Sequence, residues 1–196
     1  MSSGNSPPRT IVLSFAIALL IAVATIGAAA CDDANSPAVS QPTYEILKTE
    51  NALPEPVART RQAILAAARS GDLAALNRVL QMNELKPILG PEPVKDPVAH
   101  WKAASADGEG HSVLAALIEV LEADGVRVSG GGTEDTYVWP AFAELPLDGL
   151  TPAQTVEIYR LGKAEAVKQM IAAKTYTYYR VAIGKDGTWH AFTRRK

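Results

Sequence analysis

The sequence contains few of the side chains that usually build crosslinks and metal centres. Cys31 is the only cysteine among 196 residues, so no intrachain disulfide can form. A zinc site made of several thiolates is excluded for the same reason. His100, His111 and His190 are the only histidines, and they lie too far apart in the sequence to form a local metal-binding motif. We therefore expect neither a bound metal nor a cofactor.

The chain also lacks a strong excess of either charge. It has 19 Lys and Arg residues against 21 Asp and Glu residues, which leaves a net charge of -2. This weakly acidic balance argues against a polyanionic partner, so we expect no nucleic acid to bind. Hydrophobic residues make up 47% and charged residues 20% of the chain, a composition typical of a folded globular domain.

Common catalytic motifs are missing as well. No serine has the Gly-x-Ser-x-Gly setting of a hydrolase nucleophile. The stretch Asp107–Ser112 lacks the third glycine of a dinucleotide-binding motif and the Gly-Lys-Ser/Thr of a phosphate-binding loop. As a calcium loop it would need glycine where Ser112 stands and glutamate where Ile118 stands. We predict that Asp107–Ser112 is a loop that leads into a helix. Elsewhere in the chain, we expect the side chains of Glu134 and Asp135 to be solvated. Enzymatic activity stays open, and a non-enzymatic role is preferred.

The one long hydrophobic run lies near the N-terminus. Arg9 precedes an uncharged apolar segment from Ile11 to Ala30, which stops at Cys31 and two aspartates. A basic residue, an apolar segment and small residues in this order are typical of a secretory signal sequence. We therefore predict a signal sequence over 1–30, a flexible tether over 31–43 and one folded domain over 44–196.

The end of this run resembles the lipobox of bacterial lipoproteins, in which small residues precede an obligatory cysteine. Ala28-Ala29-Ala30-Cys31 carries the resemblance, although leucine is usual where Ala28 stands. The resemblance implies lipidation of Cys31 and an anchor on the periplasmic side of a membrane. Two alternatives are cleavage after Ala30, which yields a soluble periplasmic protein, and an uncleaved run that spans the membrane once. All three place the residues after Asp32 outside the cytoplasm.

Apolar periodicity and capping residues predict the helices of the domain. A first helix begins near Pro56, and Gly71 separates it from a second helix that Asp72 caps. Four prolines then predict an extended connector between Leu85 and Pro97. The remaining predictions are a short helix or turn with His100 and Trp101, a central hydrophobic helix through Val113–Leu121, a capping box of Thr151 and Gln154, and helices around Val156–Leu161 and Ala164–Ala173.

Two β-hairpins are predicted in the second half of the chain. The first joins Val126–Val128 to Thr136–Trp139, and the second joins Tyr176–Ile183 to Thr188–Phe192. A three-residue loop in the second hairpin would pair Ile183 with Trp189 and Val181 with Ala191. A two-residue turn would instead pair Ile183 with His190 and Val181 with Phe192. The fold class expected from these elements is α+β, with helices packed on a small antiparallel sheet.

Aromatic residues gather in the last third of the sequence. We expect most of them in the core, but an aromatic-lined ligand pocket is the alternative. Its candidate residues are Trp139, Tyr178, Trp189 and His190.

Several segments resemble a group of uncharacterised exported proteins of alphaproteobacteria. They are Ile64–Asp72, His100-Trp101, Asp107–Gly110, Tyr137–Phe142, Leu150–Gln154 and Gly184–His190. That group offers no activity to carry over. A second resemblance, of Ala68–Leu76 and Asp186–Trp189 to NTF2-like proteins, implies a cone-shaped fold with a ligand pocket, although about four strands are fewer than the cone needs.

These observations lead to an ordered set of functional hypotheses. The first is an envelope lipoprotein with a non-enzymatic binding or structural role toward an unknown envelope partner. The alternative is a protein that binds a small ligand in the aromatic pocket. A hydrolase is the least favoured, because it needs His190 to meet an acid and a hydroxyl in space.

Overall fold

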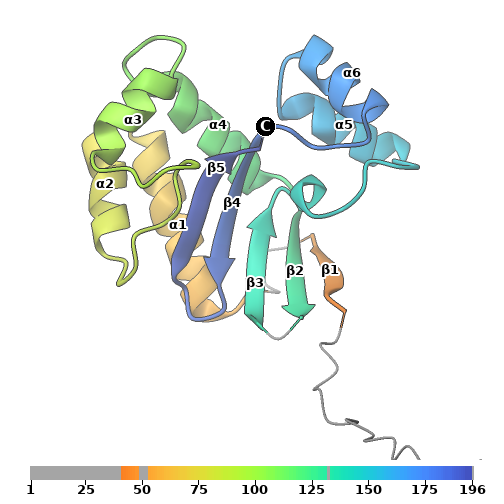
Figure 1. The fold of residues 1–196 in the computed structure, drawn as a ribbon, viewed down its shortest axis with the longest axis horizontal. Coiled ribbons are helices and arrows are strands. Elements are labelled where there is room, and N and C mark those ends of the chain that lie inside the picture. The colour runs from red at the N-terminus through yellow and green to blue at the C-terminus, as the bar shows by residue number, and fades with distance from the viewer. Residues whose placement is uncertain (1–40, 49–52, 132, 196) are drawn as a thin grey trace, which may run out of the picture. The chain divides into compact units, whose positions relative to one another are not determined.

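The computed structural model describes residues 41–48, 53–131 and 133–195, which lie within one compact unit of the chain. The predicted signal sequence, Cys31 and nearly all of the tether fall outside these residues. In the described part, helices pack against an antiparallel sheet (Figure 1), so the α+β prediction is confirmed. No described helix is both long enough and apolar enough to cross a bilayer.

The sheet has five strands in the order β1-β2-β3-β4-β5, and every neighbouring pair is antiparallel. Their bounds are β1 Thr43–Leu47, β2 Gly125–Gly130, β3 Thr133–Trp139, β4 Tyr179–Gly184 and β5 Trp189–Arg194. The four predicted strands are confirmed, although β4 begins at Tyr179 rather than Tyr176. The sequence analysis missed β1, an edge strand in which Leu47 alone is buried.

The described residues form six α-helices beside the sheet. Their bounds are α1 Glu55–Arg69, α2 Leu73–Gln81, α3 Pro97–Ala104, α4 His111–Glu122, α5 Pro152–Arg160 and α6 Ala164–Ala172. The helical hairpin predicted at Gly71–Asp72 is confirmed, because the Asp72 side chain accepts a hydrogen bond from Ala74 N–H at the start of α2. The capping box of Thr151 and Gln154 is also confirmed at the start of α5.

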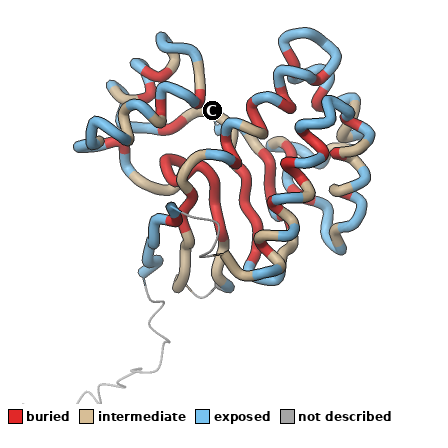
Figure 2. The backbone as a smooth tube through the Cα atoms, turned by 180° about the vertical axis from the view of Figure 1, so that it is seen from behind, coloured by how far each residue is buried: buried red, intermediate tan, exposed pale blue. Residues whose placement is uncertain are grey.

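The hydrophobic core lies between the sheet and the helices. Helix α4 contacts α1, α3 and β4, and six of its residues are buried, as expected of the central helix. Figure 2 shows that the buried residues follow the middle strands and the inward sides of the helices. Helices α5 and α6 pack as a pair near the end of β3 (Figure 1), after the short 3-10 helix η2, Ala141–Ala143.

The proline-rich connector between Leu85 and Pro97 also forms backbone hydrogen bonds with the last strand of the sheet. Ile88 N–H donates to His190 O over 2.8 Å, and Phe192 N–H donates to Ile88 O over 2.9 Å. These bonds form a single parallel bridge beside β5. The connector therefore covers part of the sheet edge, where unpaired backbone groups would otherwise be exposed.

The C-terminal hairpin combines the two predicted registers. Ile183 pairs with Trp189, as the three-residue loop predicts, and Gly187 at the end of this loop has a positive φ of 91°. Farther along, Val181 pairs with Phe192, as the two-residue turn predicts. The register shifts between Ala182 and Ile183, so β5 has one extra residue at this point. Each prediction was therefore right at one end of the hairpin and wrong at the other.

Candidate functional site

The four residues of the predicted aromatic pocket do not line one common cavity. Trp139 and Trp189 share a face of the sheet, because Trp139 pairs with Val181 and Trp189 pairs with Ile183, two residues along the same strand. Both indoles are buried, and Trp189 Nε1–H donates to Ala191 O over 3.0 Å. His190 is exposed, next to the register shift. Tyr178 lies just before β4, and burial raises the pKa of its phenol.

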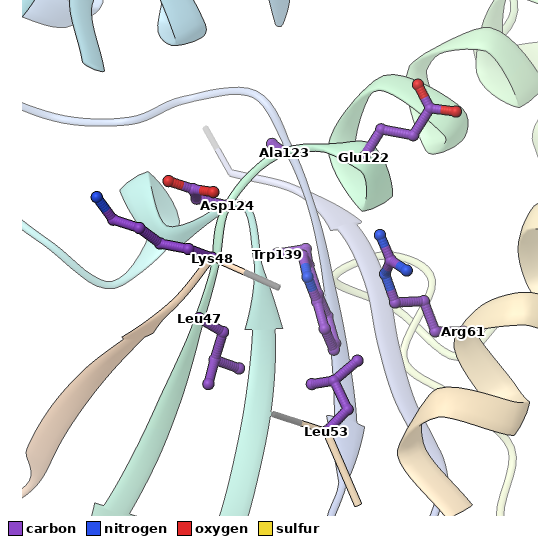
Figure 3. Close-up of a pocket in the computed structure, with 8 residues that line it drawn as sticks. All are labelled: Leu47, Lys48, Leu53, Arg61, Glu122, Ala123, Asp124 and Trp139. Atoms are coloured by element: carbon purple, nitrogen blue, oxygen red, sulfur yellow. The ribbon is translucent and has the colours of Figure 1, made fainter. Parts of the chain in front are cut away.

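Trp139 lines a cavity of about 230 Å³ at the junction of α4 and β2. We call it the Trp139 cavity; its lining comprises Leu47, Lys48, Leu53, Arg61, Glu122, Ala123, Asp124 and Trp139. Figure 3 shows the Arg61 side chain, which comes from α1, beside the Trp139 ring. The guanidinium carbon lies 5.7 Å from the ring centroid.

Arg61 has a structural role in this cavity. It is 6% exposed, and its Nε–H donates to Leu121 O over 3.0 Å, with a second donation from Nη2 to the same oxygen. Leu121 lies in the last turn of α4, where carbonyl groups have no partner within the helix. A buried guanidinium thus closes the end of α4 and stacks against Trp139.

The Trp139 cavity is a weak candidate for ligand binding. Its volume is below the range of roughly 300 to 1,000 Å³ that is usual for small-molecule sites. Its lining mixes Lys48 and Arg61 with Glu122 and Asp124, so no single charge dominates. Packing around the end of α4 accounts for the positions of these charged side chains.

A second cavity, of about 600 Å³, falls within the usual range for ligand sites. It lies between the connector, α3 and the ends of β4 and β5. We call it the Tyr179 cavity; its lining comprises Leu89, Gly90, Pro91, His100, Ala104, Thr177, Tyr179, Arg194 and Arg195. None of these nine residues belonged to the predicted pocket, although Tyr178 and Tyr179 are neighbours.

The Tyr179 ring is held on two sides. It stacks on Phe192, with centroids 5.2 Å apart and an interplanar angle of 29°, and it meets the edge of Tyr178 at 5.1 Å. The guanidinium carbon of Arg194 lies 6.0 Å from the centroids of both tyrosine rings, at the outer range of a cation–π contact. An aromatic wall and a cation are therefore adjacent.

The opposite wall is also fixed in place. His100 Nε2 lies 3.1 Å from Leu89 O, within hydrogen-bond distance. Gly90 lies beside the His100 ring, so the connector and α3 are in contact at this wall. Arg195 Nη1 donates to Ala143 O over 2.6 Å, which ties the end of the chain to η2. The polar groups of the cavity are thus positioned by tertiary contacts.

Asp186 and Thr188 lie near His190, but among the described residues the imidazole forms no hydrogen bond with either of them. Asp186 accepts hydrogen bonds from Thr188 N–H at 2.9 Å and from Thr188 Oγ1 at 2.7 Å. These bonds hold the pKa of Asp186 below its usual value. No hydrogen bond within the described residues joins His190 to Asp186 or Thr188.

The loop before α4 is organised around a carboxylate. Asp107 accepts hydrogen bonds from Ser105 Oγ and from Glu109 and Gly110 N–H, and its second oxygen lies 2.7 Å from His111 Nδ1. These contacts, the Ser105 bond first, hold the pKa of Asp107 well below its usual value. The predicted loop that leads into a helix is confirmed, because α4 begins at His111. No metal-binding cluster of His, Cys, Asp and Glu occurs in 41–48, 53–131 and 133–195.

Comparison of the chain with family models, with curated proteins and with solved structures gave no match.

The sequence analysis missed the Tyr179 cavity for an identifiable reason. It placed His100 on a short helix or turn without a binding role, and it assigned no role to Arg194 and Arg195. One sequence signal could have indicated the cavity: Tyr179 and Arg194 alternate with apolar residues along two strands that pair. This signal is informative only when the register of the hairpin is known. The contribution of Leu89 and Pro91 depends on the Ile88 bridge, which has no local signature in the sequence.

Proposed function

We propose that this protein is a lipoprotein of the bacterial cell envelope whose domain binds a small ligand in the Tyr179 cavity without catalysing a reaction. The sequence of the N-terminal segment supports the location, with a secretory pattern over 1–30 and Cys31 after three alanines. The size and lining of the Tyr179 cavity support the binding of a small ligand. The order of preference between the two earlier hypotheses therefore moves toward the small-ligand alternative.

The observation that carries the binding proposal is the combination of size and lining in one cavity. About 600 Å³ of space is bordered by apolar side chains and by a few polar groups that tertiary contacts position. Small-molecule sites typically have this composition, in which the apolar walls provide affinity and the polar groups provide orientation. We assign no reaction to the site, because its polar side chains form no nucleophile and base pair.

Labelling with radioactive palmitate tests the predicted location. The wild-type chain should incorporate label into the membrane fraction, and Cys31→Ser should not, because the thiol carries the lipid. Serine has a side chain of similar size, so Cys31→Ser should be exported like the wild type and should differ only in lacking the thiol that carries the lipid. Equal labelling of the two chains would contradict the lipid anchor.

Calorimetric titration with 2-naphthoate and 2-naphthamide tests the cavity, using the full chain in lipid nanodiscs and empty nanodiscs as the blank. Ala104 lines the cavity from the exposed end of α3, so Ala104→Trp should fill it without disturbing the core. We expect the tighter of the two probes to lose at least about tenfold in affinity, or ~1.4 kcal/mol.

Ala103→Trp is the matched control for this experiment. Ala103 is an exposed neighbour on the same helix that does not line the cavity. The affinity should change by less than about twofold, as expected for a site that is not touched. Similar losses in both variants, or no loss in either, would overturn the binding proposal.

A further inference from the structure

We infer that the ligand of the Tyr179 cavity is an organic anion, with a carboxylate, phosphate or sulfonate group joined to an apolar body. This inference rests on the proposed binding function and names the class of ligand. Three observations lead to it: the charge of the lining, the partners of its arginines and the nature of its walls.

The charge of the lining runs against that of the chain. The whole sequence has a net charge of -2, yet the cavity is bordered by Arg194 and Arg195 and by no aspartate or glutamate. A concave site lined by one sign of charge concentrates ligands of the opposite sign. Guanidinium groups also match the planar geometry of carboxylate and phosphate oxygens.

The two arginines differ from most others in their partners. Five arginines form ion pairs with carboxylates within the described chain: Arg59 with Glu55, Arg69 with Glu122, Arg78 with Asp72, Arg127 with Glu45 and Arg180 with Glu144. Neither Arg194 nor Arg195 has a carboxylate partner among the described residues. Arg194 contacts the faces of two tyrosines, and Arg195 uses Nη1 for a backbone carbonyl. Among the described residues, no carboxylate therefore forms an ion pair with either guanidinium group.

The remaining walls favour an apolar body over a bare inorganic ion. Leu89, Pro91 and Ala104 border the cavity with Tyr179, whose ring is braced by Phe192. An ion such as phosphate would leave this apolar surface in contact with water, whereas a flat organic body would cover it. The cavity thus combines a cationic end with an aromatic and aliphatic surface.

The two naphthyl probes test this inference directly, because they share one ring system and differ in charge. We expect 2-naphthoate to bind the full chain in nanodiscs at least about tenfold more tightly than 2-naphthamide. Arg194→Gln should weaken 2-naphthoate about tenfold and change 2-naphthamide less than about twofold. Arg160→Gln removes the same charge from the exposed end of α5 and should change neither probe.

Separate outcomes overturn the inference and the proposed function. Equal affinities for the two probes, with both weakened by Ala104→Trp, would overturn the anion inference and leave the cavity as a binding site. Insensitivity of both probes to Ala104→Trp would overturn the proposed function itself. Displacement of 2-naphthoate by equimolar inorganic phosphate would also contradict the requirement for an organic body. Arg195→Gln is a second test of the charge, and circular dichroism of each variant establishes that it is folded.

Discussion

The Trp139 cavity and the Tyr179 cavity both place an arginine over an aromatic ring, yet the two guanidinium groups have different roles. Arg61 is buried and donates twice to the carbonyl of Leu121, so its charge is used to close α4. Arg194 is exposed and faces two rings without a carboxylate partner among the described residues. The comparison shows that an arginine over an aromatic ring does not by itself indicate function. The surrounding hydrogen-bond acceptors and the depth of burial distinguish a structural contact from a binding one.

The largest expected effect is on stability, from Arg61→Met. Methionine retains much of the apolar stem but leaves the Leu121 carbonyl without its charged donors at a buried helix end. We expect the free energy of unfolding to fall by about 3 kcal/mol, as measured by urea denaturation. A loss below about 0.5 kcal/mol would show that Arg61 does not stabilise α4, and the contrast between the two cavities would then disappear.

Arg194→Gln should have a much smaller effect on stability. Its contacts with Tyr178 and Tyr179 are exposed, so their loss should lower the free energy of unfolding by at most about 1 kcal/mol. The same urea titration measures the change beside Arg61→Met. A loss as large as that of Arg61→Met would make Arg194 a structural residue and would weaken the distinction between the two cavities.

The smallest effect concerns the pH dependence of stability near the Trp139 cavity. Glu157 Oε1 accepts a hydrogen bond from Asp124 N–H at 2.5 Å, and partial burial raises the pKa of the Glu157 carboxyl. A raised pKa in the folded state means that folding becomes less favourable as pH rises from the ordinary pKa of the carboxyl through its raised value. Glu157→Gln keeps an oxygen acceptor and removes this titration.

The difference between wild type and Glu157→Gln should therefore depend on pH. We expect the wild type to lose stability relative to the variant between about pH 3 and about pH 7, as followed by thermal unfolding at a series of pH values. Glu134→Gln, at an exposed position in β3, is the control. A relative gain in wild-type stability over this range would contradict the raised pKa.

The helices were largely predictable because their boundaries depend on local chemistry. Asp72 caps α2 and Thr151 caps α5 through bonds to backbone groups two or three residues away. Such interactions form within a single turn and need no tertiary partner. The central position of α4 also followed from its own apolar residues, because a helix that is apolar over a wide face must be buried.

The strands were less predictable where their pairing is not local. β1 pairs Thr43 with Ser129, far along the chain, and only Leu47 at its end is buried. An exposed edge strand of this kind has too weak an apolar alternation to be recognised alone. The last hairpin was recognised, but its register shift at Ala182 and Ile183 was not, because both predicted turns assumed one continuous register.

The residues of the candidate site were mostly not predictable. Trp139, Trp189, Tyr178 and His190 were grouped because they are aromatic and near one another in sequence. Tertiary structure buries the two tryptophans and leaves His190 exposed. The Tyr179 cavity instead joins the connector and α3 to the C-terminal strands, and this contact depends on the bridge from Ile88 to β5.

The sequence by itself determined the helix boundaries and the α+β class, because each depends on residues that are neighbours along the chain. Only the tertiary structure decided which arginine is buried against Leu121 and which faces the open cavity with Tyr179. Both arginines lie on regular elements and both meet aromatic rings. The physical reason is that burial and the supply of hydrogen-bond acceptors are set by segments distant in sequence, which meet only when the chain folds.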